Sequence, residues 1–402
     1  MKIIKLLWIS LNAPTEKAEK AGSATFNHYF KEFYNDERFD IKVIAQINNS
    51  LPVMKLKDGD GFFLTRGGGL KAKLKRLSSI ESKYNPFNRN ANLISNSMVA
   101  FVKKNIEKLK SEGFLPEIVV LEWTQCVVLA DMVHRLLPDA KLVASEHDVT
   151  FVGYERKSKF YSGLQGFHWK HKYKWEKKKE LRALSMCSLI LPHNADNLEV
   201  LTAEGVEKSK IQHLVPYYNN LSSCVRNPRG KDVLFFGAMS RPENYLSAIW
   251  FIEKVMPLLE DDSIRFVILG SNPDERLKKY INKRVILTGF VDSIVPYFEQ
   301  SMCLAAPLVL GAGIKVKILE AMSSGIPVLT NRIGIEGIPA KDGVEYYHCE
   351  KPEEYVSVIK KLAEGRLSGN AEEAAREFIT KMFSFEKSLN NYKERIIKLS
   401  EE

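Results

Sequence analysis

The sequence predicts an α/β fold with two parallel-sheet domains, and three observations support this. Short β-branched runs alternate with helical segments, which is typical of parallel strands joined by helices. The alternation stops in a stretch rich in Pro, Asn, Ser and Gly that ends at Gly230, and then begins again. The length of 402 residues is also enough for two domains with cores of their own. We therefore expect one domain over 1–220 and a second over 221–384.

The first domain is expected to hold five buried strands with helices between them. The strand runs are 3–9, 41–47, 117–123, 140–146 and 188–194, and the helical segments include 95–111 and 125–136. Phe26, Phe30 and Phe33 recur at about four-residue spacing, which predicts a further helix after Gly22. Strands alternating with helices in this way build a parallel sheet covered by helices.

The second domain repeats the pattern. Its strand runs are 232–238, 264–270, 285–290, 302–308 and 326–331, and its helical segments are 244–259, 273–282 and about 315–324. The chain continues into an amphipathic stretch over 371–399, whose aromatic residues need a surface to pack against. We expect a helix at 385–399 to pack back on the first domain.

Composition excludes several classes of protein. With 45% hydrophobic and 27% charged residues, the chain is neither disordered nor a polytopic membrane protein. The apolar run at the start is interrupted by Lys5 and favours a first buried strand over a signal peptide. The five cysteines are scattered without a CxxC pair, which indicates buried thiols in a reducing compartment rather than disulfides or a metal site.

The segment 306–331 has the features of a phosphate-binding loop. A strand ends at Pro307, Gly311 and Gly313 let the backbone approach a ligand, and a helix begins near Lys315. The N–H groups at such a helix start, with the charges of Lys315 and Lys317, suit phosphate. The alternative is an ordinary turn with solvated lysines. A third glycine at dinucleotide spacing and a GxxxxGK[ST] motif are both absent, which disfavours a dehydrogenase or a P-loop enzyme.

Glu320 lies five residues after Lys315 in an apolar stretch. A carboxylate in such surroundings usually has a hydrogen-bonding role, because burying it without a partner is costly. A ribose diol is a suitable partner. The alternative is a partly exposed helix carboxylate paired with Lys317.

Four segments carry a resemblance to a known family. They are FFGAMSRPENYLSAIWF (235–251), FVILGSNP (266–273), VILTGFVDSIVPYF (285–298) and GAGIKVKILEAMSSGIPVLTN (311–331). In order and spacing they resemble the donor domain of retaining GT-B glycosyltransferases of the large family four, also called glycosyl transferases group 1. The resemblance is specific over roughly 235–340, while residues 1–220 resemble the family mainly in architecture. It implies two Rossmann-like domains facing a cleft and a nucleotide-sugar donor, with no bound metal.

The resemblance also implies roles for residues of the second domain. Glu320 would hold the nucleotide ribose, and Lys315 and Lys317, with the backbone of Gly313 and Ile314, would bind the diphosphate. Gly311 and Ala312 belong to the same donor-binding loop.

Arg241 resembles the family's basic residue that grips the diphosphate and stabilises its departure, and Phe290 and Val291 fall where the base is held. Two positions depart from the family pattern. Ala238 replaces a frequent Arg, and Ala312 stands where the first glutamate of a pair usually contacts the donor sugar. We interpret Ala312 as subfamily variation.

In the first domain the resemblance singles out two residues. His147 follows the strand run 140–146 and matches a histidine at the sugar edge of the family's cleft, so His147, Arg241 and Lys315 are the expected catalytic residues. Gly22 would let the first loop approach the donor phosphate and the acceptor. A structural histidine and a flexible entry to the first helix are the alternatives.

The net charge of +10 is concentrated in two segments. Residues 66–89 carry net +6 and residues 156–182 net +8, so the rest of the chain is slightly acidic. Both segments mix aromatic residues with the bases, which suits an anionic membrane surface. Solvated helix faces are the alternative, and nucleic acid is disfavoured because no nucleic-acid motif is present.

These observations predict a cytoplasmic retaining glycosyltransferase, peripheral on the inner face of the membrane. It would move a hexose from a UDP- or GDP-sugar to a saccharide or lipid-linked saccharide in surface polysaccharide or glycolipid synthesis, such as that of capsule or lipopolysaccharide. A non-catalytic nucleotide-sugar-binding homologue is the alternative. A nucleotide-sugar epimerase is disfavoured because suitable paired acids are absent.

Overall fold

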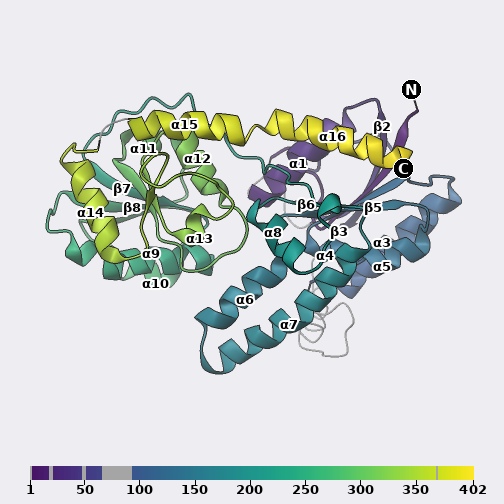
Figure 1. Ribbon diagram of the computed structural model, residues 1–402, viewed down its shortest axis with the longest axis horizontal. Coiled ribbons are helices and arrows are strands. Elements are labelled where there is room, and N and C mark those ends of the chain that lie inside the picture. Colours follow the sequence, from purple (N-terminus) through teal and green to yellow (C-terminus); the bar gives the residue numbers. More distant parts are fainter. Residues whose placement is uncertain (1, 18–20, 48–50, 66–92, 368–369) are drawn as a thin grey trace. The chain divides into compact units, whose positions relative to one another are not determined.

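The computed structural model describes residues 2–17, 21–47, 51–65, 93–367 and 370–402. Its internal contacts divide the chain into two units. The first unit consists of Met1–Ser158, Gly163–Tyr217 and Phe385–Glu402, and the second of Lys159–Ser162 and Tyr218–Ser384. Each unit is built on a six-stranded parallel sheet covered by helices, as the sequence predicts (Figure 1).

The first unit has the strand order β3-β2-β1-β4-β5-β6. The strands are β1 (Ile4–Ser10), β2 (Phe39–Ile47), β3 (Gly61–Thr65), β4 (Ile118–Glu122), β5 (Lys141–Glu146) and β6 (Leu189–Pro192). In register, Leu6 of β1 lies between Ile41 of β2 and Ile118 of β4. Because the order reverses beside β1, the loops after β1 and β4 diverge, and this is where parallel sheets bind ligands.

Seven helices follow these strands among the described residues. They are α1 (Ala21–Tyr34), α3 (Asn96–Ser111), α4 (Thr124–Val127), α5 (Ala130–Leu136), α6 (Thr150–Phe160), α7 (Gly163–Ser185) and α8 (Asp196–Ala203), with a 3₁₀ turn at Lys208–Lys210. Figure 1 shows α6 and α7 as a hairpin that extends away from the sheet of this unit. Lys157 of α6 lies 4.8 Å from the ring centroid of Trp169 in α7, a cation–π contact that joins the two helices.

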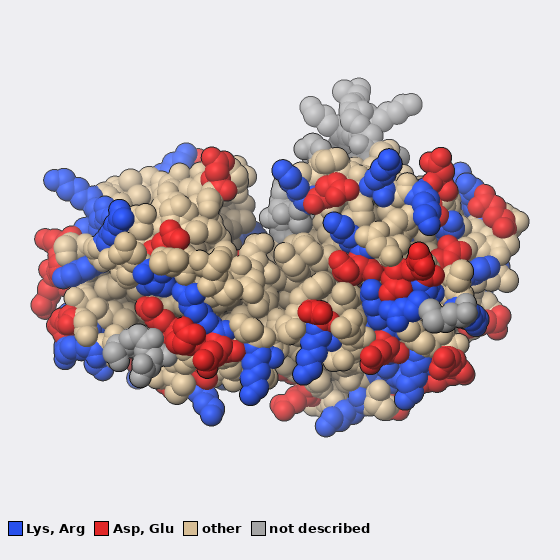
Figure 2. Space-filling view, turned by 90° about the horizontal axis from the view of Figure 1, so that it is seen from above, with Lys and Arg blue, Asp and Glu red and all other residues tan. Residues whose placement is uncertain are grey.

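The exposed surface of α7 carries one sign of charge. Its acids, Glu176 and Glu180, are both buried, whereas Lys170, Lys174 and Lys178 are exposed. Figure 2 shows a different face, on which basic and acidic side chains are interspersed. The basic character predicted for 156–182 is therefore a property of the surface of α7. The other basic segment, 66–89, lies outside the described residues.

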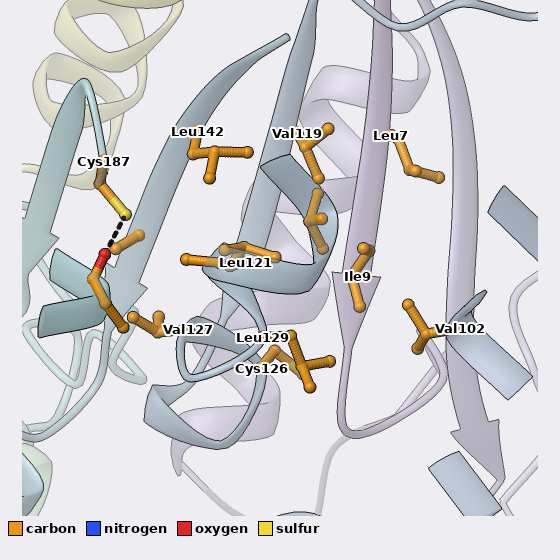
Figure 3. Packing of buried hydrophobic residues seen from close by; sticks show 14 of the residues in the cluster. Leu7, Ile9, Val102, Val119, Leu121, Cys126, Val127, Leu129, Leu142 and Cys187 are labelled. Carbon is orange, nitrogen blue, oxygen red and sulfur yellow. Dashed lines mark hydrogen bonds between the residues drawn. The ribbon is translucent and has the colours of Figure 1, made fainter. Parts of the chain in front are cut away.

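Strand alternation divides the core of the first unit between the two faces of its sheet. Leu7 and Ile9 of β1 point to one face, where they pack with Val119 and Leu121 of β4 against Val102 of α3 (Figure 3). On the other face, the alternate β1 residues Leu6 and Trp8 pack against the phenylalanines of α1. β1 is thus buried on both sides, which explains its continuous apolar sequence.

The C-terminal helix α16 (Phe385–Glu401) belongs to the core of the first unit. Its apolar side is formed by Leu389, Tyr392, Ile396 and Leu399, which pack in the same cluster as Trp8. The Tyr392 ring lies 4.8 Å from that of Phe33, measured between centroids. The amphipathic spacing of α16 therefore gives it an apolar face. This face packs against the first sheet, whose strand β1 lies almost 400 residues earlier in the chain.

The second unit repeats the topology, with the strand order β12-β11-β10-β7-β8-β9. The strands are β7 (Lys231–Phe236), β8 (Ile264–Leu269), β9 (Val285–Gly289), β10 (Cys303–Ala306), β11 (Val328–Thr330) and β12 (Tyr347–His348). The helices are α9 (Pro242–Lys254), α10 (Glu275–Lys278), α11 (Val295–Gln300), α12 (Val316–Ser324), α13 (Arg332–Ile335), α14 (Pro352–Ala363) and α15 (Asn370–Met382), with a 3₁₀ turn at Met256–Leu258. Here the order reverses between β7 and β10.

Several predicted helices are shorter than expected. The helix predicted over 244–259 ends at Lys254, and Pro257, which has no N–H, lies in the 3₁₀ turn that follows. The helix predicted over 273–282 is the single turn α10, because Asn282 Oδ1 accepts from Arg284 and Val285 and starts β9 instead. The segments 125–136 and 371–399 each form two helices.

The edge strands β3, of five residues, and β12, of two, were not predicted. All five cysteines are buried. Within the described ranges, the helices are too short or too polar to cross a bilayer.

Tyr392 tests the packing of α16. Its side chain is buried, and its hydroxyl has no hydrogen-bond partner among the described residues. Tyr392→Phe should leave the free energy of unfolding unchanged or raise it slightly, because it removes a buried unsatisfied group. Tyr392→Ala should cost about 3–5 kcal/mol by opening a cavity. Denaturant unfolding of both variants measures this, and a Phe variant as unstable as the Ala variant would contradict it.

Candidate functional site

The helix α12 presents its N-terminus at the end of the loop that follows β10. Lys315 is the residue before the first helical turn, and its side chain does not cap the helix. The N–H of Ile318 donates to the carbonyl of Lys315 at 2.7 Å, and the N–H groups before it, at the start of the helix, are the ones suited to an anion. At the other end the helix stops at Gly325, whose φ of +77° suits glycine.

Glu320 of α12 is buried, with 8% of its surface exposed. Asn219 donates to its Oε1 twice, from Nδ2 at 2.7 Å and from its backbone N–H at 3.3 Å. Oε2 has no hydrogen-bond partner within the described residues. Burial raises the pKa of this carboxyl, and the bonds from Asn219 oppose that shift. The structure thus holds one oxygen of Glu320 and leaves the other for a ligand.

Lys317, considered above as a partner of Glu320, instead donates to Asn244 Oδ1 of α9 at 2.6 Å. Asn244 Nδ2 in turn donates to the carbonyl of Ala238 at 2.9 Å, which ties α12 to the loop after β7. Burial, with the neighbouring charges of Arg241 and Lys315, lowers the pKa of the Lys317 ammonium to about 7. Three predicted cations therefore lie close enough to influence one another.

Gly237, directly after β7, leaves room for the side chains of Asn244 and Lys317. A β-carbon at this position would lie 2.8 Å from Asn244 Nδ2 and 2.9 Å from Lys317 Nζ. Its φ of +152° also favours glycine. The Gly at the end of β7 is thus required by the side chains that pack over it.

Lys315 makes an ion pair with Glu336 at 3.3 Å, and each of the two side chains is 10% exposed. Lys315 also donates to the carbonyl of Gly313. Gly311 and Gly313 have φ values of +132° and +72°, which few other residues adopt. In the loop between β10 and α12, both glycines therefore adopt positive φ, which other residues rarely do. This agrees with the expectation that they let the backbone approach a ligand.

The other predicted donor-site residues are more exposed. Arg241 precedes α9, has 64% of its side chain exposed and lies 3.5 Å from Glu243. Phe290, directly after β9, is 74% exposed. Val291, Ala312 and Ile314 are half-buried. No described contact joins Phe290 or Val291 to the three cations.

Three residues of this site were missed by the sequence analysis. Asn219, Asn244 and Glu336 hold Glu320, Lys317 and Lys315 respectively. Asn244 lies in one of the quoted motif segments, which is the signal that could have identified it. Asn219 and Glu336 lie outside the quoted segments, and only tertiary structure brings them to α12.

The first unit gathers polar side chains at the carboxyl ends of β4, β5 and β6. His147, after β5, has its Nε2 2.6 Å from Glu122 Oε1 of β4. Glu122 is buried and also accepts from Trp8 Nε1 and Ser145 Oγ, both at 2.8 Å. Burial lowers the pKa of His147 to about 3 and raises that of Glu122. His147 is therefore part of a buried polar network.

Gly22, in the first turn of α1, lies against His147. A β-carbon there would lie 3.3 Å from His147 Nδ1 and 3.5 Å from Trp123 Nε1. The Trp123 ring stacks on that of His147, with centroids 4.6 Å apart. The structure thus brings together the two residues of this unit that the sequence singled out, and adds Trp123 and Glu122.

Comparison with known proteins identifies the second unit. Residues 230–365 match the family model for glycosyl transferases group 1. This part of the chain is a glycosyl transferases group 1 domain. An uncharacterized 44.6 kDa protein in the cps region of Klebsiella pneumoniae is 32% identical over 123 residues, covering 28% of this chain and 32% of that protein. The chain therefore aligns with about a third of the length of that relative.

Solved structures show that the fold extends beyond the matched domain. Anabaena Alr3699/HepE in complex with UDP-glucose is similar over 98% of this chain and 100% of that one, with a TM-score of 0.65 and 12% identity. The lipopolysaccharide outer core galactosyltransferase WaaB is similar over 98% and 99%, with a TM-score of 0.63 and 14% identity. Two parallel sheets with these neighbours define a GT-B fold.

The low pKa of Lys317 gives the site a pH dependence. A diphosphate bound beside Lys317 would raise this pKa again, so above pH 7 such binding would take up a proton. The dissociation constant of UDP-glucose should therefore rise by up to tenfold per pH unit above pH 7 and stay nearly flat from pH 6 to 7. Calorimetry across this range measures it.

Lys317→Arg keeps its charge throughout and is the matched control, because it should remove the slope. Equal slopes for the wild type and the Arg variant would show that Lys317 does not titrate in binding.

Proposed function

We propose that the chain is a retaining glycosyltransferase that transfers a hexose from a UDP- or GDP-sugar to a saccharide or lipid-linked saccharide. The observation that carries the proposal is the donor site on the second unit. There Arg241 and Lys315 lie close enough to Lys317, in the first turn of α12, to lower its pKa, and Glu320 lies on the same helix with one carboxylate oxygen available. This matches the charge and hydrogen bonding of a nucleoside diphosphate.

In this assignment each part of the nucleotide has a partner. Oε2 of Glu320 accepts from the ribose diol, and the loop of Gly311, Ala312, Gly313 and Ile314 lies along the diphosphate. Phe290 and Val291 contact the base. Glu320 suits the ribose because Asn219 already fixes its orientation.

The chemistry follows from the charge that develops on the leaving group. As the anomeric bond breaks, negative charge builds on the diphosphate, and the cations and helix N–H groups stabilise it. Lys315 is held for this role by Glu336. The acceptor attacks from the face that the diphosphate leaves, which retains the configuration. We assign no metal to this step, since the three cations supply the charge that it requires.

We further propose a cytoplasmic role in surface polysaccharide or glycolipid synthesis, such as that of capsule or lipopolysaccharide, on the inner face of the membrane. A relative from a cps region and a structural neighbour that is a lipopolysaccharide galactosyltransferase support this role. Lys170, Lys174 and Lys178 make α7 basic, and Leu164 and Phe167 are 90% and 73% exposed beside them. Basic and apolar side chains together suit anionic lipid headgroups.

Donor binding is tested with a panel of UDP- and GDP-sugars. At least one should bind or be hydrolysed slowly, and Glu320→Ala and Lys315→Ala should each weaken binding at least tenfold. Lys278→Ala is the matched control, because this lysine lies in the same unit and its partner is Glu275 of its own helix. If calorimetry detects no binding of any nucleotide sugar, the proposal is wrong.

Membrane docking is tested by co-sedimentation with anionic vesicles. Neutralising Lys170, Lys174 and Lys178 to Gln should weaken binding by about 1 kcal/mol per base at low salt. The control replaces three exposed lysines of α3, Lys103, Lys104 and Lys108, and should change binding less. If the amount of protein that co-sediments does not depend on the lipid charge or on the salt concentration, this part of the proposal is wrong.

Ala312 supports a second candidate, a non-catalytic nucleotide-sugar-binding homologue. In the loop after β10 this position offers a methyl group where a carboxylate would contact the donor sugar. Turnover of a bound nucleotide sugar with any saccharide acceptor would eliminate this candidate. Tight binding without hydrolysis or transfer would favour it.

A further inference from the structure

Residues 219–224 precede β7 and lie in neither a helix nor a strand. Asn219, which donates twice to Oε1 of Glu320, is the first residue of this segment and is itself exposed. An exposed, irregular stretch has no ladder or helix to fix its position. The orientation of the Glu320 carboxyl therefore depends on the side chains that hold the segment in place.

Ser323 of α12 holds the first part of the segment. The N–H of Leu221 donates to Ser323 Oγ at 3.0 Å, and this hydroxyl in turn donates to the carbonyl of Glu320 at 2.8 Å. Ser323 is buried, with 2% of its surface exposed. One side chain thus links the segment to the helical turn that carries Glu320.

Arg376 of α15, a helix that packs against α12, holds the rest of the segment. Its Nη1 donates to the carbonyl of Ser222 at 2.6 Å, and its Nη2 donates to the carbonyls of Cys224 at 2.9 Å and Ser324 at 2.5 Å. Ser324 is the last residue of α12, where helix carbonyls lack an intrahelical partner and a cation is favoured. A single guanidinium therefore joins the segment to the C-terminus of the helix.

Gly325, directly after α12, leaves room for this guanidinium. A β-carbon at Gly325 would lie 2.4 Å from Arg376 Nε, so any other residue there would displace the side chain of Arg376. The described hydrogen bonds of Arg376 all go to main-chain carbonyls. An arginine suits carbonyls that lie in several directions, because its N–H groups form a rigid planar fork, whereas the lysine ammonium is a compact point charge.

We propose that Arg376 is a positioning residue for nucleotide recognition. It holds segment 219–224 against the end of α12, so that Asn219 binds one oxygen of Glu320 and the other oxygen stays available to the ribose. The inference rests on the proposed function, in which Glu320 accepts from the ribose diol. It adds that part of the selectivity for ribose over a sugar without the diol comes from a side chain of α15, which acts on Glu320 through the segment.

A cap of α12 with no further role is the other interpretation of Arg376. The bond to Ser324 alone fits that description. The bonds to Ser222 and Cys224 do not, because neither of these carbonyls belongs to a helix. Loss of a cap would change the stability of the protein, whereas loss of a positioning residue would also change which nucleotides it prefers.

The first experiment needs no substrate. In the ligand-free protein, hydrogen exchange measured by mass spectrometry should be at least tenfold faster over 219–224 in Arg376→Gln than in the wild type. Ser323→Ala should have the same effect and leaves α15 unchanged. The matched control is Ile379→Val, which loosens the buried face of α15 and keeps the guanidinium, so it should speed exchange in α15 alone. Unchanged exchange over 219–224 in Arg376→Gln would overturn the proposal.

The second experiment measures ribose selectivity by calorimetry. The probes are UDP and GDP, each compared with its 2′,3′-dideoxy form. The wild type should bind the preferred ribonucleotide at least tenfold more tightly than the dideoxy form, because only the ribonucleotide offers a diol to Glu320. Arg376→Gln and Ser323→Ala should each lower this ratio at least threefold, with the affinity for the dideoxy form unchanged. Ile379→Val should keep the wild-type ratio.

A double variant tests whether Arg376 acts through Asn219. Asn219→Ala should also lower the ratio, because it removes the bond from Nδ2 to Glu320. Adding Arg376→Gln to Asn219→Ala should then lower the ratio by less than it does in the wild type, since the two residues act on Glu320 along one path.

The contrary results are distinct from one another. If Arg376→Gln lowers the affinities for the ribonucleotide and the dideoxy form by the same factor, or if the two substitutions are additive, Arg376 has a structural role only and the proposal is overturned. A wild type that binds both forms equally would overturn it as well, because Glu320 would then not bind the ribose. Failure of all four nucleotides to bind would instead refute the proposed function, and hydrogen exchange would still decide whether Arg376 holds the segment.

Discussion

The arrangement of parallel strands is the constraint on which both sites depend. Carboxyl ends of parallel strands meet at one edge of a sheet, and the strand order reverses beside β1 and beside β7. At that edge of the first sheet lie Glu122 and His147, at the ends of adjacent strands. At the corresponding edge of the second sheet lie Gly237 and the loop before α12. Residues far apart in sequence become neighbours because the hydrogen-bonded ladder brings their strands together.

Burial then determines what these residues can do. Glu122, Lys317 and Glu320 are all desolvated, and each has a pKa shifted toward its neutral form. Each is also held by a neutral partner, respectively Ser145, Asn244 and Asn219. Neutral partners orient a charged group without cancelling its charge, so these groups remain able to respond to a ligand.

The predicted fold agrees with the structure where the sequence carries a strong period. Buried parallel strands are continuous apolar runs, and the ten strand runs expected from the sequence correspond to β1, β2 and β4 to β11. Two of the disagreements concern features that depend on neighbours. The two-residue strand β12 exists only as a pair with β11, and α10 stops after one turn because Asn282 bonds the start of β9. Neither effect has a local sequence period.

By itself, the sequence determined the two α/β repeats, the glycine loop before α12 and the basic character of α7, because each depends on residues within one short segment. Only the tertiary structure decided which partner each functional group has. Asn219 reaches Glu320 across 101 positions, Glu122 reaches His147 across 25, and Trp8 reaches Glu122 across 114. Hydrogen bonds over such separations depend on strand order and helix packing, which are properties of the folded chain.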